Sequence, residues 1–319
     1  MKPVIRNYKS DWYSARNEDR QSPPPNHDTA RLELLAPLVK QSVELALELE
    51  AEIKAPSSIM WEPNLENNAF FREYSIDYAR AWCFSYLYGT VVDLANAILR
   101  LVEGSYLNAS FALLRSAMEA FATCYHISER LERQQTICHD YIAYSFLMAE
   151  YTTKVKDAEL RRRHKMNPLY FSNKEEVEAR KRSVRKRFKA FPNPFAWMDP
   201  NSGHNMDMNA PAIIGAADKK YAKLYHLGNL EVHRNYVGTK HYVLVSSNTP
   251  LRPIPIVTCG EGHFFKNYKE LEFDFLAAEL VIRTTELAPS ILPLTNSFAL
   301  RATKLAYSGK RKLKKLVES

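Results

Sequence analysis

Apolar residues recur at intervals of three and four along several long segments of this chain, which is the repeat of an amphipathic α-helix rather than of a β-strand. In one such segment, 30–54, a continuous apolar stripe joins positions 34, 35, 38, 39, 45, 46 and 49. Similar patterns predict helices over 70–102, 105–134, 137–163, 217–236 and 269–288. Glycine is scarce, at 9 of 319 residues, whereas a fold built from hairpins needs more. The chain is therefore predicted to be all-α.

The order of these segments predicts one domain with two appendages. Residues 1–28 are polar and end in SPPPNHD, which indicates an N-terminal arm. Residues 29–298 are expected to form a single helical domain, interrupted at about 156–190 by a basic helical hairpin. Two segments of strand composition, HYVLVSS and IPIVTCG, predict a short β-hairpin near 241–258. Residues 299–319 are expected to be a basic C-terminal tail.

Positive charge is concentrated in two parts of the chain. The net charge is +8, yet residues 161–189 carry twelve Lys and Arg against three Glu, and residues 301–319 carry seven against one. Such clusters bind nucleic acid by neutralising phosphates, although many charged runs are only solvated helix faces. The candidate RNA-binding residues in the hairpin are Arg182, Arg185, Lys186, Arg187 and Lys189.

Several classes of site lack their sequence signatures. No HExxH or Cys/His grouping is present, so no metal site is predicted, and without Walker, GxGxxG or GxSxG motifs no cofactor is predicted. The four cysteines form no CxxC pair, which is typical of reduced thiols. No secretory signal is evident and no apolar run approaches the roughly 18–20 residues that span a bilayer. We expect a cytoplasmic protein with no membrane contact.

The helix predicted over 105–134 carries charge beside its apolar stripe. At 100° per residue, a polar column follows the flank of the core, where charges are expensive unless they are paired. Its members are Asn108, Arg115, Glu119 and His126. Arg115 and Glu119 are four residues apart, so we favour a structural ion pair between them, with a functional polar centre as the alternative.

A second cluster of polar groups lies in EVHRNYVGTKHY, residues 231–242. Arg234 and His241 return to within about 20° of one helix face, with Gly238 between them, and Asn235 is able to orient the arginine. Histidine exchanges protons near neutral pH and arginine grips phosphate, so the pair suits metal-independent RNA cleavage by internal transesterification.

These residues resemble the signature of the HEPN superfamily, in which an Arg followed directly by a polar residue is separated from a His by a gap of four to six residues. The resemblance implies an all-helical, often dimeric protein, frequently a metal-independent ribonuclease of toxin–antitoxin or phage-defence systems. It makes Arg234 and His241 catalytic and Asn235 supporting.

A longer stretch, about 75–245, resembles a family of bacterial helical proteins of unknown function. The resemblance rests on LLRSAMEAFATCYHI, DYIAYS and YAKLYHLGNLEVH. It implies a polar centre of Arg115, Glu119, Tyr225 and His233, with His233 rather than His241 as the principal histidine.

Together these patterns predict an all-α, HEPN-like bundle. The leading hypothesis is a metal-independent endoribonuclease of a phage-defence or toxin–antitoxin system that acts as a homodimer on RNA. The first alternative is a non-catalytic module that binds RNA or a partner protein within a defence complex. A further alternative is an enzyme that acts on a small molecule with Glu119 as its base.

Overall fold

The computed structural model describes the helical body of the chain and a few shorter segments. These residues are 29–54, 76–103, 107–142, 144–145, 182, 186–189, 193–198, 209–232, 243–245, 255–257, 272–292 and 296–318. The predicted N-terminal arm and most of the predicted basic hairpin lie outside them.

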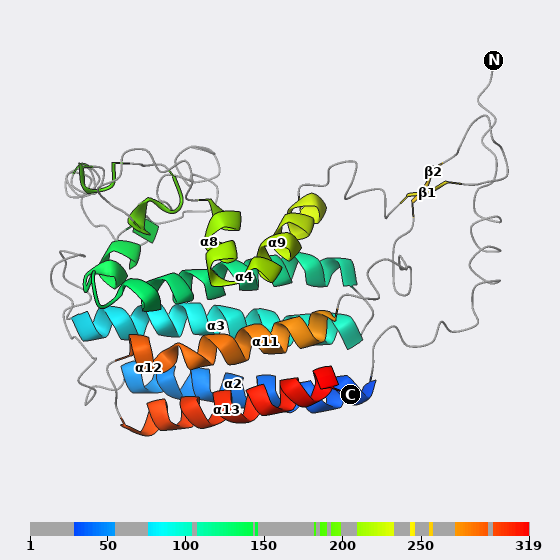
Figure 1. Ribbon diagram of the computed structural model, residues 1–319, viewed down its shortest axis with the longest axis horizontal. Helices are drawn as coiled ribbons and strands as arrows, with labels where there is room; N and C mark the ends of the chain where they lie inside the picture. Colours follow the sequence, from blue (N-terminus) through cyan, green and yellow to red (C-terminus); the bar gives the residue numbers. More distant parts are fainter. Residues whose placement is uncertain are drawn as a thin grey trace, which may run out of the picture.

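The regular secondary structure of the described part of the chain is helical except for two short strands (Figure 1). Its main helices are α2 (Thr29–Lys54), α3 (Ile76–Glu103), α4 (Leu107–Arg130), α8 (Ala210–Ala217), α9 (Lys219–Val232), α11 (Phe273–Glu286), α12 (Ala288–Ile291) and α13 (Asn296–Glu318). A 3-10 turn, η2, spans Ala196–Met198. The predicted all-α class is confirmed.

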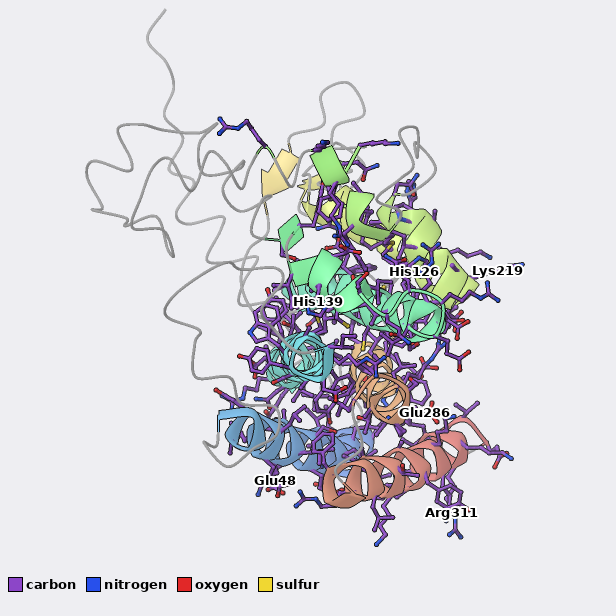
Figure 2. All side chains as sticks on the ribbon, turned by 90° about the vertical axis from the view of Figure 1, so that its left-hand side faces the viewer. Glu48, His126, His139, Lys219, Glu286 and Arg311 are labelled. Carbon is purple, nitrogen blue, oxygen red and sulfur yellow. The ribbon has the colours of Figure 1, made fainter. Side chains whose placement is uncertain are left out.

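The long helices lie in three layers (Figures 1 and 2). Helices α3 and α11 form the middle layer, α4 covers one side and carries α8 and α9, and α2 and α13 cover the other side. Helix α11 is buried over most of its surface, as expected for a helix with apolar residues on nearly all sides. Tyr88 of α3 is fully buried, and its hydroxyl group donates to the Ser42 carbonyl and accepts from Thr285, which ties the middle layer to α2.

The C-terminal segment is not the tail that the sequence analysis predicted. It forms α13, which packs against α2 and α11. The buried residues of α13 follow the helical repeat: Phe298, Ala302, Leu305, Ala306 and Leu313. The prediction was wrong because it followed the high density of Lys and Arg and overlooked the apolar residues that recur along one face of the helix.

Gly309 lets α13 approach α11 closely. A Cβ atom at this position would lie 2.7 Å from Cγ1 of Ile282 and closer still to Cδ1. By contrast, a Cβ on Gly89 in α3 would meet nothing within 4 Å. The two helical glycines therefore differ in what alanine would do at each position.

We expect Gly309→Ala to lower the free energy of unfolding by up to about 2 kcal/mol, because overpacking costs about 1–3 kcal/mol and helix propensity returns only about 1 kcal/mol. Gly89→Ala is the matched control and is expected to raise it by about 0.5–1 kcal/mol. Urea unfolding measures both. In an Ile282→Ala background the Gly309 change is expected to become neutral or stabilising; persistence of the full loss there would contradict the close-approach explanation.

The helix predicted over 217–236 corresponds to α9, which begins at Lys219, and a separate helix, α8, precedes it at 210–217. Helix α8 begins earlier, where the Asn209 side chain accepts from Ala212 N at 3.0 Å. Helix α8 ends at Asp218, whose backbone is extended. The Oδ1 atom of Asp218 accepts a hydrogen bond from Lys220 N at 2.8 Å, at the start of α9. An aspartate that caps a new helix is indistinguishable in sequence from one inside a helix.

The two strands are β1 (Val243–Val245) and β2 (Pro255–Val257), which pair antiparallel with Val243 opposite Val257. Both lie within the 241–258 range for which the sequence predicted a hairpin; the residues that connect them are outside the described part. Among the described helices, none is both long enough and apolar enough to cross a membrane.

Candidate functional site

A closed polar network joins α4 to α9. Arg115 Nη2 lies 2.9 Å from Glu119 Oε1 and donates to the Tyr225 hydroxyl at 2.9 Å. The Tyr225 hydroxyl in turn donates to the same Glu119 oxygen at 2.5 Å. The Arg115 guanidinium also lies over the Tyr225 ring, 5.0 Å from its centroid. Three groups from two helices thus bond to one another in a triangle.

Helical spacing explains the position of this network. Arg115 and Glu119 are one turn apart on α4, and both side chains are only partly exposed, at 22% and 37%. Tyr225 is buried on the face of α9 that packs on α4. Buried polar groups need hydrogen-bond partners, and here each of the three supplies a partner to the other two.

The electrostatics of the network keep the Tyr225 hydroxyl protonated. Burial, reinforced by the hydrogen bond and the negative charge of Glu119, raises the pKa of Tyr225 to about 12. Tyr225 therefore keeps its proton at neutral pH and remains a donor. Glu119 accepts hydrogen bonds from both partners.

His126 lies on α4 in the same predicted column but does not belong to the network. Burial, and then the charge of Arg130, lowers the pKa of His126 to about 4. Its Nε2 is buried without a hydrogen-bond partner. His126 is therefore neutral at pH 7. The side chain of Asn108 lies outside the described residues.

The candidate catalytic residues also lie outside the described residues. These are His233, Arg234, Asn235 and His241. Helix α9 ends at Val232, so the described chain stops one residue before them. Tyr225 lies seven residues before that end, or about two helical turns.

The predicted RNA-binding cations in the hairpin differ in their surroundings. Arg187 is ion-paired with the buried carboxylate of Asp140. Burial raises the pKa of Asp140, while Arg187 acts in the opposite direction. Arg182, Lys186 and Lys189 are exposed, and Arg185 lies outside the described residues. Arg187 is thus engaged in holding this segment to the helical body.

Sequence reasoning missed a second polar contact, between α11 and the α8–α9 junction. Arg283 donates to Asp218 Oδ2 at 2.6 Å and to the Ala217 carbonyl at 3.3 Å, and it lies over the rings of Phe121 and Tyr221. Burial opposes ionisation of Asp218, but the Lys220 N–H and Arg283 lower its pKa overall. The available signal was a cation within the mainly apolar FDFLAAELVIRTTE.

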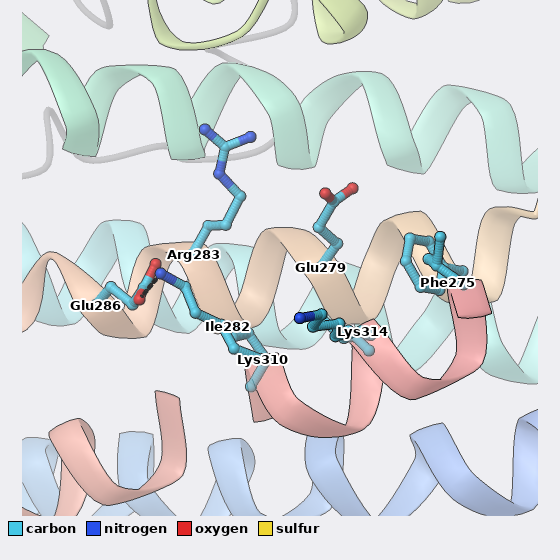
Figure 3. A pocket seen from close by; sticks show the side chains of 9 residues that line it. Phe275, Glu279, Ile282, Arg283, Glu286, Lys310 and Lys314 are labelled. Carbon is cyan, nitrogen blue, oxygen red and sulfur yellow. Dashed lines mark ion pairs between the residues drawn. The ribbon is translucent and has the colours of Figure 1, made fainter. Parts of the chain in front are cut away.

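A groove of about 420 Å³ lies between α11 and α13 (Figure 3). Its charged groups are already paired: Lys310 with Glu286, and Glu279 with Lys220 at 3.0 Å. Arg283 and Glu279 point away from α13, towards α4. The groove therefore offers no unpaired charge of this set to a ligand.

The described residues contain no metal-binding cluster, and two of their buried cysteines have raised pKa values. They include no group of three or more His, Cys, Asp or Glu side chains arranged to hold a metal ion. Cys83, Cys124 and Cys138 are free and buried. Burial raises the pKa of Cys83 and Cys124, so both remain thiols at neutral pH rather than nucleophilic thiolates.

Fold and site define an all-helical protein with a polar network between two packed helices. Residues 81–250, more than half of the chain, match the model of a family of unknown function, DUF5677. The chain belongs to this family, which confirms the predicted membership of a family of unknown function. No curated protein and no solved structure matches the chain. The matched span includes Arg115, Glu119 and Tyr225, whereas α2, α11 and α13 lie outside it.

Proposed function

We propose that the protein is a metal-independent endoribonuclease of the HEPN type that acts in phage defence or as a toxin. The observation that carries this proposal is the closed network of Arg115, Glu119 and Tyr225. Efficient catalysis requires reacting groups on rigid supports. The network fixes α9 on α4 about two turns before the residues that resemble the HEPN signature.

The proposed roles follow from the chemistry of each side chain. Arg234 holds the scissile phosphate and stabilises the charge of the phosphorane. His241, or His233, takes the proton of the 2′-hydroxyl as it attacks phosphorus and returns a proton to the departing 5′-oxygen. Asn235 orients Arg234 or the substrate. The products are a 2′,3′-cyclic phosphate and a free 5′-hydroxyl, and a homodimer is the expected active form.

One observation favours a second candidate function. The three groups of the network bond to one another, and Tyr225 keeps its proton at neutral pH. A network of this kind also suits a purely structural role. The protein would then be a non-catalytic module that binds RNA or a partner protein in a defence complex.

The direct test is RNA cleavage by the purified protein in EDTA. We expect cleavage with cyclic phosphate ends, reduced about 100-fold or more in both Arg234→Ala and His241→Ala, because positioned acid–base groups contribute at least that much. Matched controls are Arg133→Ala and His226→Ala, since both side chains are exposed. These controls should cleave normally.

Two results would contradict this function. One is no cleavage by the wild-type protein across a panel of structured and single-stranded RNAs. The other is unchanged cleavage in correctly folded Arg234→Ala and His241→Ala variants. RNA binding without cleavage would select the non-catalytic alternative.

A further inference from the structure

Helix α13 carries the densest positive charge among the described helices. It contains seven Lys and Arg against one Glu. Its apolar stripe is buried against α2 and α11, while Leu300 and Val317 lie exposed outside that stripe. All of this charge is therefore displayed on the flanks and outer face of a helix that is firmly packed.

The cations on the flanks are neutralised within the protein. Arg301 lies 2.7 Å from Glu48 of α2, and Lys310 pairs with Glu286 of α11. Lys314 lies 3.6 Å from Glu318 of α13 itself. The described residues provide no ion-pair partner for the remaining cations, which are Lys304, Arg311, Lys312 and Lys315.

Three of these free cations form a ridge with an exposed aromatic ring. At 100° and about 1.5 Å per residue, Lys304, Tyr307, Arg311 and Lys315 fall within an arc of about 80° and extend over about 16 Å. The Tyr307 side chain is 73% exposed and lies between the cations. Lys312 flanks the ridge on the side of α2. Figure 2 shows Arg311 on the outside of the bundle, at the opposite end of the layers from Lys219 of α9.

We propose that this α13 ridge, formed by Lys304, Tyr307, Arg311 and Lys315, docks single-stranded RNA. The cations neutralise successive phosphates, and Tyr307 provides a face on which an unpaired base stacks. The inference rests on the proposed function only in naming RNA as the polyanion. It gives the substrate-holding role to α13, rather than to the hairpin residues that the sequence indicated.

The structure favours a nucleic acid over a membrane as the occupant. Amphipathic helices bind bilayers by inserting their apolar face, but the apolar face of α13 is buried in the bundle. The exposed side chains along the ridge are three cations, one aromatic ring and Leu300, and cations around an aromatic ring are the pattern of single-strand binding surfaces. An anionic vesicle is the competing occupant in the test.

The ridge also lies far from the α4–α9 network. Two helix-packing steps, roughly 20 Å in all, separate the layer of α13 from that of α4. The ridge is therefore expected to affect the affinity for RNA, and hence KM, and to leave kcat unchanged.

The test is binding of a fluorescently labelled single-stranded RNA by the full chain carrying His241→Ala, measured by anisotropy at 50–200 mM salt. With four phosphates neutralised, by the three cations of the ridge and by Lys312, a slope of about −0.7 per contact predicts roughly 50-fold weaker binding over this range. In the Arg311→Gln/Lys315→Gln variant, raising the salt over the same range should weaken RNA binding by only about 7-fold. Tyr307→Ala should weaken binding by about 5-fold or more.

Two further double variants identify which surface of the protein binds the RNA. Lys219→Gln/Lys223→Gln, with the same loss of charge on exposed positions of α9, should bind as the parent does. Arg182→Gln/Lys186→Gln tests the hairpin. If either double variant lost as much affinity for RNA as the Arg311→Gln/Lys315→Gln variant, the assignment to α13 would be overturned. A ridge variant that binds RNA normally would overturn it as well. Ridge-dependent binding to anionic vesicles without RNA binding would also overturn it.

Failure of this inference is distinguishable from failure of the proposed function. Binding that depends on the ridge, without any cleavage by the wild-type protein, would refute the ribonuclease and leave the docking surface standing. Cleavage that depends on Arg234 and His241, with an unchanged KM in the Arg311→Gln/Lys315→Gln variant, would refute the docking surface alone.

Discussion

Replacing Arg31 with alanine is expected to lower the free energy of unfolding by about 3–5 kcal/mol, the loss typical of breaking a buried ion pair on one side. Arg31 of α2 donates to Asp274 Oδ2 at 2.7 Å and to Glu272 Oε1 at 2.6 Å. Asp274 is almost completely buried in the first turn of α11. Its second oxygen, Oδ1, has no hydrogen-bond partner. Without Arg31, this carboxylate would lose its ion pair within the core.

Urea unfolding of a small set of variants tests this dependence. Arg301→Ala is the matched control, because the Arg301–Glu48 pair is about half exposed on both sides and such pairs contribute at most about 1 kcal/mol. Asp274→Leu in the Arg31→Ala background should recover much of the loss, since no charge is then buried. A loss from Arg31→Ala no larger than that from Arg301→Ala would show that Asp274 does not depend on this arginine.

The Arg31–Asp274 contact also marks where the sequence stops predicting the fold. Apolar periodicity is local, and it identified the core stripe of α4, in which Phe111, Leu114, Met118 and Phe121 are buried. The pairing of Arg31 with Asp274 joins positions 243 residues apart. No spacing rule applies over such a separation. The apolar periodicity therefore could not predict that α2 packs against α11.

The candidate site was predictable to a similar extent. The spacing of Arg115 and Glu119 on one helix face predicted their ion pair, and the family resemblance added Tyr225. What neither supplied is the hydrogen bond from Tyr225 to Glu119, because it depends on how α9 crosses α4. Arg283 was missed for the same reason: its partner Asp218 lies on a different element, 65 residues away.

The same network gives the second large effect. Arg115→Ala is expected to lower the free energy of unfolding by about 2–3 kcal/mol, because hydrogen bonds to charged groups contribute about 1.5–3 kcal/mol and Glu119 would lose its positive partner. Tyr225→Phe, which removes only the hydroxyl group, should lower it by about 1–2 kcal/mol. In a closed triangle the two losses are coupled. The double variant should therefore depart from the sum by about 0.5 kcal/mol or more.

If the losses of unfolding free energy in Arg115→Ala and Tyr225→Phe were strictly additive, the network would not be closed. The cleavage assay distinguishes two roles for the network, which are holding α9 on α4 and positioning the residues beyond Val232. Both variants are assayed at a temperature at which their urea and thermal unfolding curves show that they are folded. If the network only holds α9 on α4, the folded variants cleave RNA with unchanged kcat. If it positions the residues beyond Val232, kcat falls while KM stays constant, because misplaced groups weaken transition-state rather than ground-state contacts. Variants of the α13 ridge are expected to show the reverse pattern, so the two surfaces are separable in one set of kinetic measurements.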